Sequence, residues 1–188
     1  NKMWGTYEQK FAQLRTLYLY MFTHPGKKLN FMGNELAHWR EWDEQKENDW
    51  FLLSYPAHDA FHKYFALLGE LYTEDPTLYE KDYSWESFEW IDADNADKNM
   101  FSYLRKGKDK DYVIILNFSP NMYRHEVFGV ASKGSYREII NTEWERFGGT
   151  LQPQQCHAAR VSRNNKPYMI EADIPPFGGV LLEVQKDE

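Results

Sequence analysis

The sequence has little cysteine, no long apolar run and no excess of positive charge. Its one cysteine, Cys156, cannot form an internal disulfide, which indicates a reducing compartment and predicts a cytoplasmic protein. No apolar run approaches the roughly 20 residues that a transmembrane helix requires, so we expect no membrane partner. The formal net charge of −7 argues against nucleic acid, or an anionic membrane surface, as a partner.

Motifs of metal and cofactor chemistry are also absent. The sequence contains no Gly-rich phosphate loop, no nucleophile elbow, no thiol pair and no HExxH word. His58 and His62 have the i,i+4 spacing of a helical metal pair, with Asp59 between them, but this spacing alone favours a packed or solvated helix face. We therefore expect neither a metal nor another cofactor.

The length indicates part of a larger protein. A complete (β/α)8 barrel takes about 250 residues. With 42% hydrophobic and 27% charged residues, the 188-residue chain can form a globular core, but it is too short for a barrel plus a second domain. The chain also begins Asn-Lys-Met rather than with an initiator methionine. The alternative is a complete small α+β domain with a trimmed start.

Helical periodicity dominates the first 82 residues. Apolar side chains recur at helical spacing over residues 7–22, with Thr6 as the expected N-cap and Pro25 ending the helix. A second apolar face predicts a helix from residue 57 or 58 to about residue 73. Between the two helices, residues 29–32 have the pattern of a short strand. Helix, strand, long loop and helix is the order expected at the end of a (β/α)8 barrel.

After Tyr83 the pattern changes to short alternating runs separated by turn residues, which is typical of antiparallel β structure. The predicted strands are residues 88–91, 100–105, 111–118, 125–129, 136–141, 168–174 and 179–184, with a hairpin turn at 107–110 and a long surface loop at 150–166. Seven aromatic residues are expected in the sandwich core or against the barrel: Trp85, Phe88, Trp90, Tyr103, Phe118, Tyr136 and Phe177. The predicted fold class is therefore α+β: the last βα part of a (β/α)8 barrel over residues 1–82, then an all-β sandwich domain over residues 83–188.

Residues 25–50 combine the expected strand, a Gly-Asn-Glu turn and tryptophans interleaved with carboxylates. Pyranose C–H faces stack on aromatic rings, and sugar hydroxyls need charged donors and acceptors, so this segment predicts a saccharide-facing loop. The candidate substrate-binding residues are Asn34, Glu35, Trp39, Arg40, Trp42 and Trp50.

These candidates also have structural interpretations. Glu35 either lines a saccharide-binding cleft or caps a helix or loop amide, and Asn34 suits the left-handed geometry of a turn. The tryptophans either stack on sugar or wedge the loop onto the barrel wall. Asp49 is expected to cap the turn before Trp50. Arg40 is expected to pair with one of three nearby carboxylates: Glu41, Asp43 or Asp49.

A series of short sequence motifs resembles those of a known family. They are Phe31-Met32-Gly33-Asn34-Glu35, Glu41-Trp42, Asp49-Trp50, Phe88-Glu89-Trp90, Asn117-Phe118-Ser119-Pro120 and Pro175-Pro176. Through these motifs the chain resembles, over nearly its whole length, the glycogen branching enzymes, which are the 1,4-α-glucan branching enzymes of the α-amylase superfamily. The motifs between residues 31 and 50 are specific for this family. The later motifs are weak individually and support the resemblance through their order along the chain.

The resemblance implies where the chemistry lies. Members of that family carry a catalytic (β/α)8 barrel and a small C-terminal β sandwich, with catalytic carboxylates after the fourth, fifth and seventh strands. The resemblance places Asn1 just past the seventh barrel strand. It therefore implies that this chain holds no catalytic residue and is inactive alone. A retaining pair made of Glu35 and Glu41 is disfavoured for the same reason.

The resemblance also implies an activity for the intact protein. It would cut an α-1,4-glucan with retention, through a covalent glucosyl-enzyme, and transfer the segment to a glucose 6-hydroxyl to form the α-1,6 branches of glycogen. Neither metal nor nucleotide is needed. The alternatives are a non-catalytic carbohydrate-binding or structural module and another hydrolase of the superfamily. Because a strand at residues 29–32 lacks neighbours in this chain, we also expect self-association.

Overall fold

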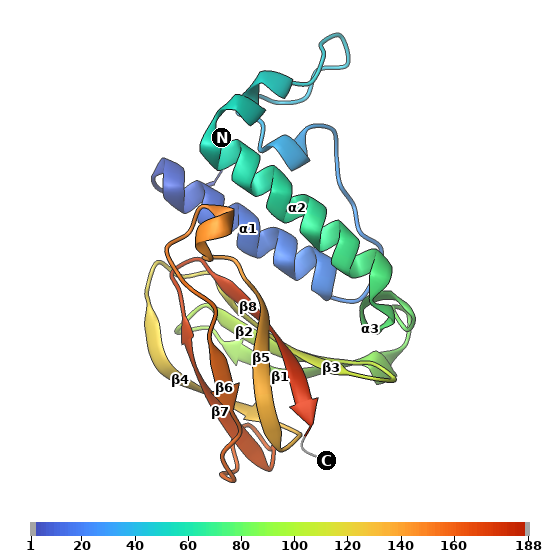
Figure 1. Cartoon of the computed structure of the whole chain (residues 1–188), viewed down its shortest axis with the longest axis vertical. Coiled ribbons are helices and arrows are strands. Elements are labelled where there is room, and N and C mark those ends of the chain that lie inside the picture. Colours follow the sequence, from blue (N-terminus) through green and yellow to red (C-terminus); the bar gives the residue numbers. More distant parts are fainter. Residues whose placement is uncertain (1–2, 187–188) are drawn as a thin grey trace.

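Two long helices pack on a β sandwich in the computed structural model, which describes residues 3–186 (Figure 1). The helices are α1 (Tyr7–Thr23), α2 (Pro56–Glu74) and the short α3 (Pro76–Tyr79). Thr6 is the N-cap of α1, as predicted, and forms a capping box with Gln9. Both predicted helices are confirmed, and α3 follows α2 because Asp75 accepts a hydrogen bond from the Thr77 amide. Within residues 3–186, no helix is both long and apolar enough to cross a membrane.

In the described part of the chain, eight strands form two antiparallel sheets. The strands are β1 (Phe88–Asn95), β2 (Met100–Lys106), β3 (Asp111–Asn117), β4 (Tyr123–Val130), β5 (Gly134–Asn141), β6 (Gln155–His157), β7 (Tyr168–Ile174) and β8 (Gly179–Lys186). The larger sheet has the order β1-β2-β3-β8-β5-β6, and β4 pairs with β7 in the smaller one. The seven predicted strands are confirmed. β6 lies inside the predicted loop 150–166, because three residues are too few for an alternating pattern and only pairing with β5 reveals the strand.

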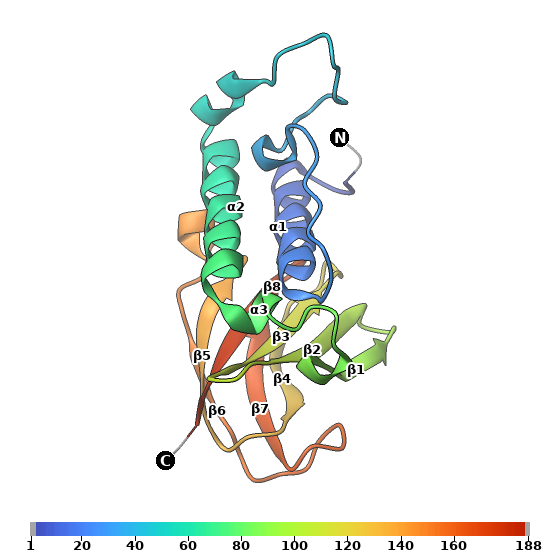
Figure 2. The same cartoon turned by 90° about the vertical axis from the view of Figure 1, so that its right-hand side faces the viewer.

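The six-stranded sheet is covered on both faces (Figure 2). α1 and α2 lie on one face, and the β4–β7 pair lies on the other. Alternate residues of β3 therefore enter different cores. Ile114 and Leu116 pack with the helices, whereas Val113 and Ile115 pack with β4 and β7. Burial on both faces explains why β3 is a continuous apolar run rather than an alternating one.

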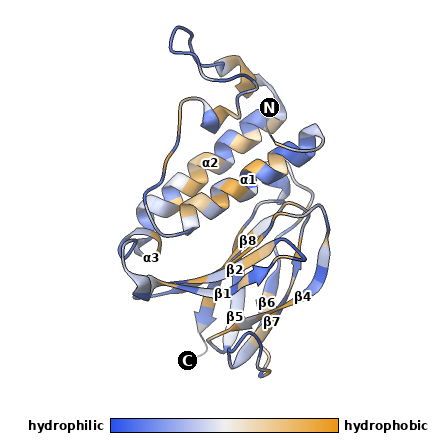
Figure 3. Ribbon diagram, turned by 180° about the vertical axis from the view of Figure 1, so that it is seen from behind, coloured by the Kyte–Doolittle hydropathy of each residue, from blue (hydrophilic) through white to orange (hydrophobic). Residues whose placement is uncertain are grey.

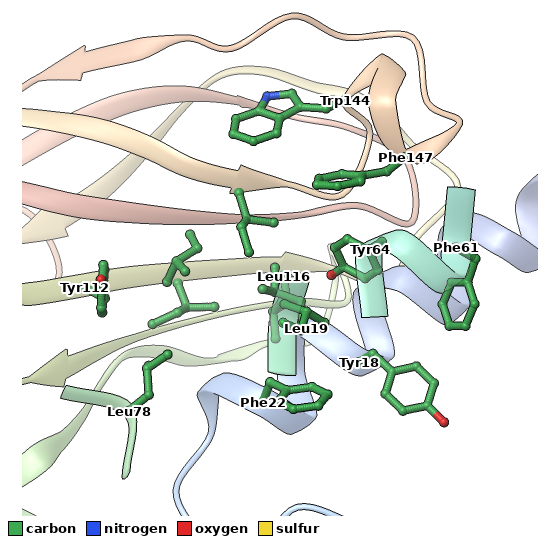
Figure 4. Packing of buried hydrophobic residues seen from close by; sticks show 14 of the residues in the cluster. Tyr18, Leu19, Phe22, Phe61, Tyr64, Leu78, Tyr112, Leu116, Trp144 and Phe147 are labelled. Atoms are coloured by element: carbon green, nitrogen blue, oxygen red, sulfur yellow. The ribbon is translucent and has the colours of Figure 1, made fainter. Parts of the chain in front are cut away.

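One buried cluster joins the helices to the sheet (Figure 4). It includes Leu19 of α1, Tyr64 of α2 and Leu116 of β3, all with less than 1% of their surface exposed. The Tyr64 hydroxyl also donates to the Arg15 carbonyl oxygen (2.9 Å). Residues 1–82 and 83–188 thus share a core, and the boundary between two domains at this point stays a prediction.

The strand predicted at residues 29–32 is not formed, and this prediction was wrong. Leu29, Phe31 and Met32 are 77%, 46% and 46% exposed. A strand needs a neighbour about 4.8 Å away to accept and donate its backbone hydrogen bonds. Residues 3–186 place no strand beside this segment, so it is an unpaired loop that ends in a turn, where the Asn34 amide donates to the Phe31 carbonyl oxygen (2.9 Å).

The aromatic residues expected inside the sandwich or against the barrel divide into three groups. Phe88 and Phe118 are partly buried and pack against the cluster between helices and sheet. Tyr103, Tyr136 and Phe177 are buried as predicted, but Trp85 and Trp90 are 86% and 42% exposed. Trp90 lies on β1, the edge strand of the large sheet, and Trp85 lies in the turn before it. Trp90 is nevertheless partly packed, because its ring contacts the rings of Phe88 and Tyr103. An edge strand leaves the rest of a large side chain in solvent, and Trp85 is more exposed still.

A buried guanidinium ties the ends of the helices to the sheet. Arg105 of β2 is completely buried and donates to the carbonyl oxygens of Thr23 (2.9 Å), Thr77 (3.2 Å) and Leu78 (3.1 Å). It also forms an ion pair with Asp82 at 2.9 Å. These partners belong to the end of α1, to α3 and to the linker before β1, so one side chain fixes three segments.

Glu138 of β5 is a second buried ionisable group. It is 6% exposed, and its Oε1 accepts a hydrogen bond from Nε1 of Trp144 at 2.6 Å. Burial raises the pKa of Glu138 to about 7, although the hydrogen bond from Trp144 acts to lower it. The folded chain therefore holds this proton more tightly than the unfolded chain does.

Arg105→Ala is expected to lower the free energy of unfolding by about 3–5 kcal/mol, because the buried Asp82 carboxylate loses its direct ion pair and three carbonyl oxygens lose their donor. Asp82 then keeps only Lys28, at 3.7 Å, and the Tyr72 hydroxyl. Urea unfolding measures the loss. The matched control is Arg124→Ala, which removes an ion pair whose arginine side chain is 69% exposed and is expected to cost less than about 1 kcal/mol. Equal losses in the two variants would contradict the role assigned to Arg105.

Glu138→Gln is expected to stabilise the protein as the pH rises. Since the folded pKa is raised, the wild-type chain loses stability between pH 4.5 and about 7 as Glu138 ionises. The variant keeps an acceptor for Trp144 and carries no charge. It should match the wild type near pH 4.5 and exceed it above pH 7 by on the order of 3 kcal/mol. Urea unfolding at several pH values checks this, with Glu145→Gln as the exposed control; parallel pH profiles for wild type and Glu138→Gln would refute it.

Candidate functional site

The loop that carries the candidate residues rests on α2 through two histidines. Nδ1 of His58 donates to the carbonyl oxygen of Leu36 (2.7 Å), and Nδ1 of His62 donates to that of Glu35 (3.2 Å). These bonds hold the short 3-10 helix Asn34–Leu36 against the long helix. The i,i+4 histidine pair thus has a structural role: it positions a loop.

A glycine turn leads into this short helix. Gly33 has φ +82°, and a Cβ at this position would lie 2.5 Å from the His38 ring. Only glycine fits both the left-handed backbone and the close approach of the imidazole. Asn34 lies in the turn, where its carbonyl oxygen accepts a hydrogen bond from the Ala37 amide (3.0 Å). The left-handed geometry predicted for Asn34 falls on Gly33 and Ala37 instead.

A pocket of about 330 Å³ lies between this loop and the first turns of α1. Three of the six candidate residues line it: Asn34, Trp39 and Arg40. The other lining residues are Met3, Tyr7, Lys10, Phe11, Leu14, Ala37, His38 and Glu41. Sequence reasoning missed Tyr7 and Lys10, because a helix pattern indicates which face is apolar but not which distant loop lies over the first turn. Aromatic rings together with amine, guanidinium and carboxylate groups are chemically suited to a saccharide.

Trp39 both packs and faces solvent. Its ring contacts the His58 ring edge to face, with centroids 5.0 Å apart, and lies 5.6 Å from the Tyr55 ring. The side chain nevertheless remains 46% exposed. The segment around it, above the helices, is largely hydrophilic (Figure 3). Trp39 is therefore a partly supported ring that offers exposed aromatic surface at the pocket.

Arg40 organises the loop beyond the pocket. Its Nε and one terminal nitrogen donate to both carboxylate oxygens of Asp49, at 2.9 and 3.1 Å, and the same terminal nitrogen donates to the Glu47 carbonyl oxygen at 2.7 Å. The pairing of Arg40 with Asp49 was one of three predicted alternatives. Asp49 precedes the 3-10 helix Trp50–Ser54 but makes no side-chain capping bond there. The predicted capping role of Asp49 is wrong, because Arg40 already engages its carboxylate.

Three candidates do not line the pocket. The Glu35 carboxylate accepts a hydrogen bond from the side-chain Nδ2 of Asn30 (2.8 Å), so it supports the loop before the turn. Trp42 contacts the Phe31 ring edge to face, with centroids 5.4 Å apart, and Trp50 is 49% exposed. The structure thus brings together half of the predicted set.

The fold places the chain in a known class. Residues 90–185 match the family described as alpha amylase, C-terminal all-beta domain. The matched range begins within β1 and ends within β8, so it takes in both sheets of the sandwich. The chain belongs to this family.

The more specific similarity covers the helices as well. The chain is 42% identical over 191 residues to a 1,4-alpha-glucan branching enzyme of Geobacillus stearothermophilus, covering 99% of this chain and 30% of that protein. It is 47% identical over 154 residues to the branching enzyme of Oceanobacillus iheyensis, covering 81% of this chain and 24% of that protein. The resemblance predicted from the sequence is confirmed. The chain spans at most about 30% of the length of these curated relatives.

A solved structure has the same fold at low sequence identity. The α-amylase of Geobacillus thermoleovorans, crystallised with acarbose, aligns with a TM-score of 0.61 and 14% identity. The alignment covers 95% of this chain and 34% of that one, so it includes the two helices as well as the sandwich. This similarity supports the predicted α+β arrangement of helices followed by a β sandwich.

Proposed function

We propose that this chain is the C-terminal portion of a 1,4-α-glucan branching enzyme. The intact enzyme transfers a segment of α-1,4-glucan to a glucose 6-hydroxyl and so forms the α-1,6 branches of glycogen, by a retaining mechanism in the cytoplasm. The observation that carries the proposal is the 42% identity to a branching enzyme over 99% of the chain.

The arrangement of the helices supports an origin in a (β/α)8 barrel. Ring contacts link Phe11 to Phe61 near the start of α1 and Phe22 to Tyr72 near its end, so α1 and α2 run in the same direction. Residues 24–55 return the chain from the end of one helix to the start of the next. Consecutive helices of such a barrel have this parallel relation, with a strand in the return segment. In the intact enzyme, residues 29–32 would form that strand once neighbouring strands are present.

The role of this chain in that enzyme is to shape one wall of the glucan cleft. Trp39 and Arg40 offer a ring and a fixed guanidinium beside the pocket, and the sandwich supports α1 and α2 from below. The catalytic carboxylates lie outside this chain, so it is inactive alone. The reaction of the intact enzyme needs neither metal nor nucleotide. A non-catalytic carbohydrate-binding module is the second candidate, because the same pocket would serve it.

An amylose branching assay tests the function. The 188-residue chain is compared with a chain extended upstream through the barrel, and branching is followed as a fall in iodine absorbance. We expect activity only in the extended chain. Activity in the short chain would contradict the upstream placement of the catalytic carboxylates, and inactivity of both would favour the binding module.

We further propose that the chain self-associates through the segment that would be a barrel strand. Leu29, Phe31 and Met32 expose apolar surface beside Trp42, and a second copy would cover it. Light scattering is expected to give a mass above that of the monomer, and Phe31→Glu should reduce it. Val161→Glu, at a residue 50% exposed on the sandwich, is the matched control. A wild-type chain that stays monomeric at high concentration would rule the proposal out.

A further inference from the structure

A second pocket lies on the sandwich, in the connection between β5 and β6. Its volume is about 340 Å³, which is at the lower end of the range for ligand pockets. It is lined by Trp144, Glu145, Arg146, Leu151, Gln152 and Pro153. None of these residues lines the loop pocket next to α1. The proposed function uses none of them.

Two aromatic rings position the Arg146 guanidinium that lines this pocket. The guanidinium carbon of Arg146 lies 4.4 Å from the ring centroid of Trp144 and 4.6 Å from that of Phe147. The two rings stack with centroids 5.9 Å apart, and both belong to the core cluster (Figure 4). The core holds them in place: Trp144 donates to Glu138, and Phe147 packs against Tyr64 of α2 at 4.8 Å. The guanidinium is therefore held on a rigid surface.

The polar groups of this pocket are available to a ligand. Arg146 has no hydrogen-bond or ion-pair partner among residues 3–186, and the same holds for the exposed side chains of Glu145 and Gln152. Arg40 contrasts with this, because its donors are taken up by Asp49. An arginine positioned by stacking, with its N–H groups unused, is ready to donate hydrogen bonds without first breaking an ion pair.

The lining groups select a class of ligand. A bare anion would meet the Glu145 carboxylate beside Arg146, and an apolar ligand would leave the guanidinium and the Gln152 amide unpaired. A neutral polyhydroxyl ligand uses the donors and the acceptors together, and its C–H face can lie on Leu151 and Pro153. A sugar unit has both of these features.

We propose that this pocket is a second saccharide-binding site, which holds a unit of an α-1,4-glucan chain against Arg146 and Gln152. The identity of the sugar rests on the proposed function, whereas the existence of the site rests on the geometry of the sandwich. A long glucan could occupy this site and the loop pocket together, so that two weak sites give a larger overall affinity.

The test uses the 188-residue chain, ¹⁵N-labelled, with maltoheptaose as the probe. The Nε–Hε signal of Arg146, assigned by its loss in Arg146→Ala, is expected to shift in a saturable way. Gln152→Ala removes one hydrogen bond from an exposed side chain and should raise the Kd read from that signal about fivefold. Arg146→Ala should reduce the retardation of the chain in glycogen-containing gels. Arg124→Ala, an exposed arginine elsewhere on the sandwich, should leave both measurements unchanged.

Three results would overturn the inference. The first is gel retardation by glycogen that Trp39→Ala abolishes and Arg146→Ala leaves unchanged. That result would contradict the second site and be compatible with the proposed function. Another is an Arg146 signal that inorganic phosphate shifts and maltoheptaose does not, which makes the pocket an anion site. The third is no binding of either glucan by the wild-type chain. The branching assay on the extended chain then decides the proposed function independently. If Arg146→Ala fails to fold, Gln152→Ala is measured by retardation in the glycogen gel, which needs no assignment of the Arg146 signal, and the test stays decisive.

Discussion

The arrangement of the helices on the sheet depends on the buried guanidinium of Arg105. A charge without exposed surface is tolerated only when hydrogen bonds and a counter-charge replace the water that it loses. Three carbonyl oxygens and the Asp82 carboxylate do this for Arg105, and they come from α1, α3 and the linker to β1. The apolar cluster supplies most of the driving force for packing, but it is not directional. The guanidinium adds direction, because its donors fit only one placement of the helix ends.

The candidate site takes its shape from that placement. α2 is held on the sheet, and its buried face presents His58 to the Leu36 carbonyl oxygen while His62 reaches that of Glu35. The loop is thus fixed at its start by the two histidines and further along by Arg40 and Asp49. A pocket forms where the loop passes over the first turns of α1. The two histidines and the Arg40–Asp49 pair position the site, whereas Trp42 and Trp50 lie outside the pocket.

The sequence predicted those elements of the fold that are determined by interactions between residues close together in the chain. The helices and the seven long strands were predicted because periodicity and turn residues act within a few positions. Residues 29–32 carry a strand pattern, yet the strand is not formed, since pairing requires a partner that residues 3–186 do not supply. β6 was missed for the opposite reason: its three residues carry no pattern, and the neighbouring β5 defines it. Trp85 is exposed and Trp90 only partly packed, because both lie at the edge of the large sheet and burial there depends on which distant side chains reach that edge.

By itself, the sequence determined the class of fold, the resemblance to the glycogen branching enzymes and the segment that carries the candidate residues. Composition, residue spacing and the order of motifs are properties of the linear sequence, so they can be read without a tertiary structure. Only the tertiary structure decided that Trp39 and Arg40 share a pocket with Tyr7 while Trp42 and Trp50 lie outside it. It also decided that Asp49 binds Arg40 instead of capping a helix. These outcomes depend on which distant side chains meet when α1, α2 and the sheet pack together, and a linear pattern does not contain that information.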